Sequence, residues 1–293
     1  MDFGLILPSY RQGASVESID AAAESAARAG WSGVFTTDHV LVEESERSDD
    51  YFQIFDAIVT LAHVAAHQPG LKVGVSVIVV PMRNAVLLAK ELATIDALSG
   101  GRLICGVGMG WNRHEFGHLG LEDRFVRRGA YVEEAIGLWR YLWGGGTGPF
   151  EGRFHRFGEV RFGPLPVQGS AVPIWMGGRD ERALIRAGRL ADAYHSSASS
   201  PAQLAVRVPI VRAAAAEAGR PEPLISARVR AAFGANDTPW YRLAGTAEQM
   251  IGELHHFAQV GVGHVAVDFA ETNVARHREA FERFDSEVRA AFR

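Results

Sequence analysis

The sequence predicts a (βα)8 TIM barrel of the α/β class, and three observations lead to this prediction. Short apolar runs alternate with amphipathic runs along all 293 residues, which is the pattern of strands joined by helices. Several apolar runs show almost no polar alternation, as expected of parallel strands covered by helices on both faces. Two of these runs, 102–110 and 172–178, end in glycines before the chain enters a helix.

The first half of the chain contains four strand and helix pairs. We expect strands over 3–8, 33–37, 72–80 and 103–108, and helices over 15–29, 54–67, 86–98 and 128–143. Ser15 is typical of a helix beginning and Gly30 of a helix end, and Pro69 with Gly70 ends the second helix. The third strand is dense in Val and Ile, and Pro81 ends it. Polar loops are predicted over 43–50 and 109–127.

The second half repeats this alternation after one interruption. We expect strands over 173–176, 192–196, 224–233 and 264–269, and helices over 180–190, 202–218, 247–260 and 274–292. Residues 144–168 do not fit a strand and helix pair. There Phe150, Phe154 and Phe157 lie among glycines and charges, which is typical of a surface hairpin insertion.

Eight strands in strict alternation with helices close into a barrel, because parallel strands need right-handed helical crossovers. A doubly wound open sheet is the alternative. It would leave two edge strands that carry too little charge to protect an edge, and Trp111 stands where the dinucleotide fingerprint requires its third glycine. We therefore expect one barrel domain over 1–293, with loop insertions at its C-terminal face.

Composition excludes several classes of protein. The net charge is −4 and no basic block occurs, so nucleic acid is not an expected partner. Neither a signal segment nor an 18-residue apolar run is present, which favours a cytoplasmic protein without membrane contact. Cys105 is the single cysteine, and its place inside an apolar strand favours inert core packing over nucleophilic chemistry.

Polar and glycine residues gather where predicted strands end, which is where barrel enzymes place their function. Gly177, Gly178 and Arg179 precede a helix, whose first amides attract phosphate. Asp180 and Glu181 lie in the same turn and leave open an ordinary capped helix.

Asp38 and His39 follow the second strand. A polar pair at this point is either a buried salt-linked anchor or, through His39, a group that exchanges protons near neutral pH.

The segment from His114 through Glu115 to His118 matches the H-E-x-x-H pattern of zinc hydrolases. That pattern requires a helix, and Gly117 disfavours one here. A zinc hydrolase is therefore kept as a remote alternative, and no metal ligand is assigned.

Four stretches resemble the bacterial luciferase-like flavin and deazaflavin oxidoreductases, which are (βα)8 barrels. They are Val77–Asn84 (VIVVPMRN), Leu98–Leu103 (LSGGRL), Gly106–Trp111 (GVGMGW) and Pro173–Gly178 (PIWMGG). The resemblance implies a bulge at Ser76-Val77, often with a non-proline cis peptide, that supports the central ring of the cofactor. It also implies further cofactor contacts from Asp38, His39, Gly106, Val107, Gly108, Asn112, Gly177, Gly178 and Arg179.

The subfamily that this chain most resembles depends on the deazaflavin coenzyme F-420. The resemblance implies hydride transfer between that coenzyme and an unidentified small-molecule organic substrate, with His39 as the catalytic proton carrier, in a homodimer. Some relatives place a glutamate in the loop where this chain has Met109. The alternative on the same barrel is an FMN-dependent monooxygenase.

Overall fold

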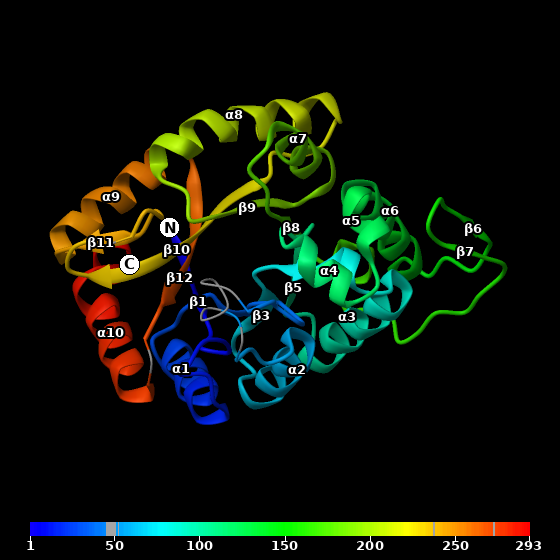
Figure 1. Cartoon of the computed structure of the whole chain (residues 1–293). Coiled ribbons are helices and arrows are strands. Elements are labelled where there is room, and N and C mark those ends of the chain that lie inside the picture. Colours follow the sequence, from blue (N-terminus) through cyan, green and yellow to red (C-terminus); the bar gives the residue numbers. More distant parts are fainter. Residues whose placement is uncertain (45–50, 52, 237, 272) are drawn as a thin grey trace.

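The computed structural model describes residues 1–44, 51, 53–236, 238–271 and 273–293. Within this part of the chain, eight parallel strands close into a barrel, counting β3 and β4 as one interrupted strand, and helices surround it (Figure 1). Most of the predicted loop over 43–50 lies outside the described residues. No helix in the described ranges is both long enough and apolar enough to span a membrane.

The strands of the barrel follow each other round the ring in chain order. They are β1 (Asp2–Ile6), β2 (Gly33–Thr36), β3 (Lys72–Val75) continued by β4 (Ile78–Val79), β5 (Leu103–Gly108), β8 (Ile174–Met176), β9 (Ala193–Ser197), β10 (Leu224–Phe233) and β12 (Val262–Phe269). Every pairing between neighbours is parallel, and β12 pairs with β1 to close the ring. The barrel prediction is confirmed, and the open sheet is excluded.

The covering helices lie where hydrophobic periodicity predicts them. They are α1 (Val16–Arg28), α2 (Ala57–His67), α3 (Ala85–Ser99), α6 (Arg128–Trp143), α7 (Glu181–Leu190), α8 (Pro201–Glu217), α9 (Ala247–Gln259) and α10 (Val274–Glu287). Ser15, Ser200 and Thr246 each form a capping box, in which side chain and backbone satisfy each other's hydrogen bonds. The second helix begins later than predicted, because Asp56 caps it and Ile54 instead bridges to Tyr10.

Three segments differ from the prediction or refine it. The expected loop over 109–127 contains two short helices, α4 (Arg113–His118) and α5 (Glu122–Val126). A short strand, β11 (Leu243–Gly245), pairs in parallel with β10 where only a loop was predicted. The predicted hairpin insertion is confirmed by the antiparallel pair of β6 (Phe150–Glu151) and β7 (Arg156–Phe157).

The two ends of the described chain pack against each other. The last helix was predicted over 274–292. In the structure α10 ends at Glu287, and a 3-10 turn over Arg289–Phe292 follows. The rings of Phe3 and Phe292 have centroids 5.9 Å apart, and Arg289 donates to the carbonyl of Ala29. Figure 1 accordingly shows both termini close together.

The main hydrophobic core lies between the barrel and its helices. Its largest buried rings include Trp139 and Trp143 of α6, whose indole nitrogens donate to the carbonyls of Ala85 and Ala89 on α3. Cys105 is fully buried in this core, and burial raises the pKa of its thiol to about 12. The expectation of an inert core cysteine is confirmed.

Glycines in β5 permit a very close approach of the neighbouring strand. A Cβ on Gly106 would lie 1.8 Å from the carbonyl oxygen of Val75, and one on Gly108 would lie 2.4 Å from Cγ2 of Val77. The interrupted strand formed by β3 and β4 therefore approaches these glycines closely, whereas the sequence suggested the approach of a ligand. Contact of Gly106 and Gly108 with a cofactor stays a prediction.

We predict that Gly106→Ala lowers the free energy of unfolding by about 3 kcal/mol, because the added methyl overlaps the Val75 carbonyl. Urea unfolding of wild type and variant measures the difference. Gly137→Ala is the matched control, since a Cβ there meets no atom within 4 Å on the exposed face of α6. It should leave stability unchanged or raise it by about 0.5–1 kcal/mol. A Gly106→Ala protein as stable as wild type would contradict the overlap.

Candidate functional site

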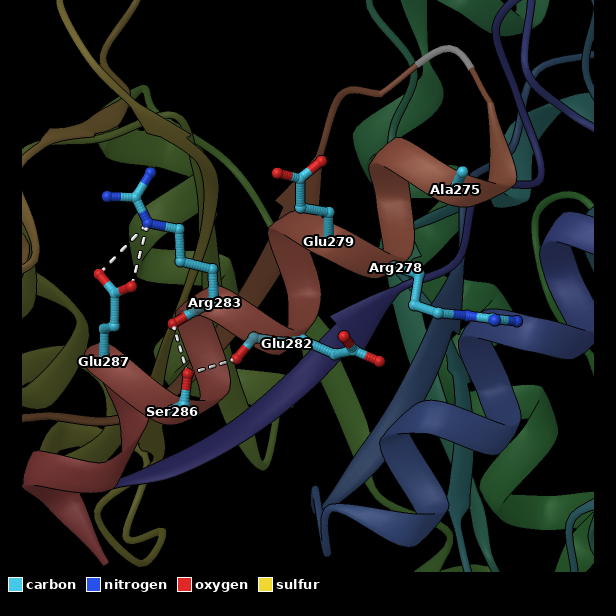
Figure 2. A pocket seen from close by; sticks show the side chains of 7 residues that line it. All are labelled: Ala275, Arg278, Glu279, Glu282, Arg283, Ser286 and Glu287. Atoms are coloured by element: carbon cyan, nitrogen blue, oxygen red, sulfur yellow. Dashed lines mark hydrogen bonds and ion pairs between the residues drawn. The ribbon is translucent and has the colours of Figure 1, made fainter.

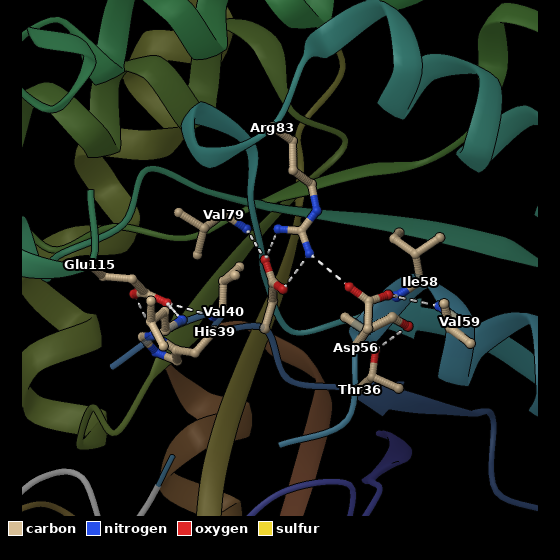
Figure 3. A network of polar contacts seen from close by, with 12 residues as sticks. Thr36, His39, Val40, Asp56, Ile58, Val59, Val79, Arg83 and Glu115 are labelled. Atoms are coloured by element: carbon tan, nitrogen blue, oxygen red, sulfur yellow. Dashed lines mark hydrogen bonds and ion pairs between the residues drawn. The ribbon is translucent and has the colours of Figure 1, made fainter. Parts of the chain in front are cut away.

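Asp38 is the centre of a buried ion pair at the end of β2. Arg83 donates to its two carboxylate oxygens at 2.7 and 2.8 Å, and the Val79 amide donates at 2.7 Å. Arg83 also reaches Asp56 at 3.3 Å, as Figure 3 shows. The anchor interpretation of Asp38 thus agrees with these contacts, which join β2, β4 and the beginning of α2. A cofactor contact of Asp38 stays a prediction.

His39 is paired with a buried carboxylate from another loop. Its Nδ1 lies 2.8 Å from Oε2 of Glu115, and Oε1 of Glu115 accepts from the amides of Val40 and Leu41 (Figure 3). Burial alone would raise the pKa of Glu115, but the hydrogen bonds from His39 and these amides outweigh it and hold the pKa below its usual value. Glu115 is therefore an ionised acceptor that holds a proton of His39 on Nδ1.

This arrangement leaves Nε2 of His39 without a hydrogen-bond partner among the described residues. The imidazole packs against two aromatic rings, with Tyr51 at 4.3 Å and Trp111 at 5.8 Å between ring centroids, and these two rings also lie 6.4 Å from each other. Tyr10 in turn stacks on Tyr51 at 6.0 Å. An imidazole with a carboxylate on one nitrogen and an unengaged second nitrogen is suited to proton transfer.

Ser76 and Val77 lie where β3 gives way to β4, and the peptide bond between them is cis, as the resemblance implied. The Ser76 side chain points into the barrel and is 2.8 Å from Nε2 of His195. Its carbonyl oxygen accepts from Arg228 on β10, on the other side of the barrel. Val77 is half-buried.

A cluster of charged side chains joins the ends of β1, β10 and β12. Asp268 accepts from Tyr10 at 2.6 Å, from Arg11 at 3.2 Å and from Arg228 at 3.4 Å. Burial raises the pKa of Tyr10 to about 12, so its hydroxyl stays protonated. Burial alone would also raise the pKa of Asp268, but Arg11, Arg228 and Arg230 hold it well below its usual value.

The remaining predicted residues lie on the opposite strands. Val107 has its side chain in the outer core, and its carbonyl accepts from the amide of Gly177 at 3.2 Å. Asn112 caps α4 by accepting from the His114 amide, and it donates to Glu43 at 2.6 Å. Contact of Val107 and Asn112 with a cofactor stays a prediction.

The turn before α7 has some features of an anion site. Gly178 has a φ of 155°, and a Cβ there would lie 2.4 Å from that of Ala183. Asp180 caps the helix through the Ala183 amide at 3.0 Å. Within the described residues no acceptor is found for the amides of Gly178 and Arg179, and exposed Arg179 holds the Ser197 carbonyl. These donors fit a phosphate group.

The residues of the H-E-x-x-H pattern do not form a metal centre. They lie on α4, so a helix forms although Gly117 disfavours one; Asn112 caps its beginning. Glu115 turns to His39, and His118 turns to the Leu41 carbonyl. In the described ranges no group of three or more His, Cys, Asp or Glu side chains is arranged to hold a metal ion.

A hollow of about 500 Å³ lies along the outer side of α10 (Figure 2). Its lining includes Arg278, Glu279, Glu282 and the ion pair of Arg283 with Glu287 at 3.2 Å. The lining residues come from a single helix, and no other element of the described structure contributes to the hollow. This hollow is therefore not the candidate site.

Several residues of the site were not identified from the sequence. Glu115 was read only as part of a metal pattern, although its partner is His39, 76 positions away. Arg228 and Arg230 were also missed. The sequence did indicate them, because two arginines at alternate positions of an apolar strand share one face, which here is the barrel interior.

Comparison with known proteins gives a consistent result. A family model described as luciferase-like monooxygenase matches residues 1–291. The chain is 31% identical over 176 residues to the 5,10-methylenetetrahydromethanopterin reductase of Methanopyrus kandleri, covering 56% of this chain and 49% of that protein. It is 34% identical over 167 residues to the FMNH2-dependent dimethylsulfone monooxygenase of Pseudomonas putida, covering 55% of this chain and 45% of that protein. The chain thus spans about half the length of these curated relatives.

Solved structures agree in fold over nearly the whole chain. The coenzyme F-420-dependent tetrahydromethanopterin reductase from Methanopyrus kandleri gives a TM-score of 0.82 at 19% identity, covering 100% of this chain and 99% of that one. The oxygenating constituent of 3,6-diketocamphane monooxygenase from Pseudomonas putida, in complex with FMN, gives 0.82 at 16% identity, covering 98% of both chains. At these identities the likeness shows the fold.

We predict that Glu115→Gln lowers the free energy of unfolding by about 2 kcal/mol near neutral pH. The amide nitrogen of Gln cannot accept the bonds that the second carboxylate oxygen accepts now. Because the pKa of Glu115 is lowered by folding, its contribution is present above the unfolded pKa of about 4.3 and is lost as pH falls through the folded value.

The difference between wild type and Glu115→Gln should therefore be constant from about pH 6 to 8 and shrink below about pH 4. Denaturant unfolding at several pH values measures it. Exposed Glu122→Gln is the control and should change little. A difference that grows with acidification would contradict an ionised Glu115.

Proposed function

The chain belongs to the luciferase-like monooxygenase family of oxidoreductases, and on this premise we propose that it transfers a hydride between coenzyme F-420 and a small organic substrate. The paired side chains of His39 and Glu115 carry the proposal. They provide a positioned proton carrier at the carboxyl end of β2, where barrel enzymes bind their reactants. The similarity to a methylenetetrahydromethanopterin reductase supports the reductase chemistry.

The described residues fit the parts of a deazaflavin. The amides of Gly178 and Arg179 are suited to its phosphate. Ser76 and half-buried Val77 are suited to its ring, two strands round the barrel from Gly178. When bound in its reduced form, this coenzyme supplies the hydride.

The protein's own residues supply the proton and the positioning. Glu115 keeps the Nδ1 proton of His39 in place, so Nε2 is the atom that accepts or donates a proton during turnover. Met109 stands where some relatives have a glutamate, and its sulfur accepts from Arg186 at 3.3 Å. A thioether carries no exchangeable proton, which leaves His39 as the proposed carrier. Tyr51 and Trp111 flank it with apolar surface.

An FMN-dependent monooxygenase is the second candidate. It is favoured by the 34% identity to the FMNH2-dependent dimethylsulfone monooxygenase, which matches this chain over a similar length. On this candidate the same barrel would bind FMN, and the reduced flavin would react with oxygen. A homodimer stays a prediction for both candidates.

Equilibrium binding distinguishes the two candidates. We predict that purified protein binds coenzyme F-420 at least about tenfold more tightly than FMN, a difference of about 1.4 kcal/mol. Fluorescence titration with each cofactor measures this ratio. Tight FMN binding without affinity for F-420 would move the function to the second candidate, and binding of neither would reject both.

We predict that His39→Asn lowers the rate of the chemical step about 100-fold while changing the dissociation constant of the cofactor less than about threefold. Asn can donate to Glu115 in place of Nδ1 but has nothing in place of Nε2. Single-turnover kinetics and cofactor titration measure the two quantities. Surface His67→Asn is the control. Unchanged turnover in His39→Asn would mean that His39 carries no proton.

A further inference from the structure

A row of four hydrogen-bonded side chains, here called the hydrogen-bond chain, crosses the interior of the barrel, where bulky apolar side chains are usual. Nδ1 of His264 on β12 lies 2.8 Å from Oγ of Ser226 on β10, which lies 2.8 Å from Nδ1 of His195 on β9. Nε2 of His195 lies 2.8 Å from Oγ of Ser76 at the end of β3. All four residues are at most 4% exposed.

Both imidazoles in this chain are neutral. Burial above all lowers the pKa of His195 and of His264 to about 3. A neutral imidazole has one N–H donor and one bare nitrogen, and a serine hydroxyl has one proton to donate. If Ser226 accepted from both imidazoles, its own proton would have no acceptor among the described residues. With that proton paired, the hydrogen bonds all run in one direction, either from His264 towards Ser76 or from Ser76 towards His264.

The surroundings of His264, at the end of the hydrogen-bond chain farthest from Ser76, distinguish these two directions. Nε2 of His264 is buried and has no hydrogen-bond partner among the described residues. Its ring contacts the rings of Phe35 and Trp175, and a Cβ on Gly4 would lie 2.9 Å from Nε2. An unpaired N–H at such a place is rarer in proteins than an unpaired acceptor.

We propose that hydrogen bonds in the hydrogen-bond chain are donated from His264 through Ser226 and His195 to Ser76. This direction makes the Ser76 hydroxyl a hydrogen-bond donor to the bound ligand. His264 donates from Nδ1 to Ser226, Ser226 donates to Nδ1 of His195, and His195 donates from Nε2 to Ser76. Oγ of Ser76 then accepts from His195, and no other described residue accepts its proton. His195, Ser226 and His264 are positioning residues for Ser76.

The ligand atom that pairs with Ser76 is a hydrogen-bond acceptor, such as a carbonyl oxygen or a bare ring nitrogen. This part rests on the proposed function, because the acceptor belongs to the cofactor or substrate at the carboxyl end of the barrel. Ser76 lies close to the centre of that end, since Arg228 from β10 reaches its carbonyl oxygen across the barrel. The direction of the chain itself does not depend on which ligand binds.

The first arm of the test reads the tautomers in the wild-type protein and uses variants only to assign signals. Long-range ¹⁵N–¹H NMR of the wild-type protein, with signals assigned through His195→Asn and His264→Asn, reports which ring nitrogen carries each proton. We expect opposite tautomers, with the proton on Nε2 in His195 and on Nδ1 in His264. A proton on Nδ1 of His195 would reverse the chain and overturn the proposal.

The second arm measures the dissociation constants of coenzyme F-420 and FMN. Ser76→Ala and Ser226→Ala should each weaken whichever cofactor the wild type binds about threefold to tenfold. Ser196→Ala is the matched control, because Ser196 is also buried but its hydroxyl has no partner in the described structure. Unchanged affinity in Ser76→Ala would overturn the donor role. If the wild type binds neither cofactor, the proposed function fails, while the tautomers still decide the direction of the chain.

Discussion

Burial of carboxylates at one end of the barrel is the constraint on which the rest of the site depends. Asp38, Glu115 and Asp268 are each at most 5% exposed, and an isolated buried carboxylate would cost several kcal/mol. Each is therefore surrounded by donors from other elements: Arg83 for Asp38, His39 for Glu115, and Arg11 with Arg228 for Asp268. Compensation of these charges fixes how the strand ends and their loops are arranged.

The three carboxylates with their donors have different structural roles. Asp38 with Arg83 secures β2 to β4 and to the cap of α2, and it leaves the neighbouring His39 to a different partner. Glu115 comes from α4, a helix that follows β5 in the sequence, so the proposed proton carrier His39 depends on a partner from a later part of the chain. Asp268 lies beside Tyr10 across the barrel from β8, where the amides suited to phosphate are found. A long ligand would therefore contact opposite walls.

Much of the architecture could be predicted from local patterns. Apolar runs place β10 and α6 at their observed ends, because the burial pattern is set over a few neighbouring residues. β11 was missed because three residues carry no period, and only the pairing with β10 makes them a strand. The contact of His39 with Glu115 joins residues 76 positions apart, which periodicity does not reveal. Gly106 was singled out as a cofactor contact, which stays a prediction; the close approach of Val75 to this glycine depends on strand pairing, which the local sequence does not reveal.

The packing of Phe3 against Phe292 has a practical consequence for handling the protein. β1 begins at Asp2, on the side of the barrel where strands start, and the final turn returns to the same side. An affinity tag or fusion partner attached at either terminus would thus emerge away from His39 and Ser76. The two termini also lie near enough for a short peptide to join them, which makes circular permutation a feasible way to open the chain elsewhere (Figure 1).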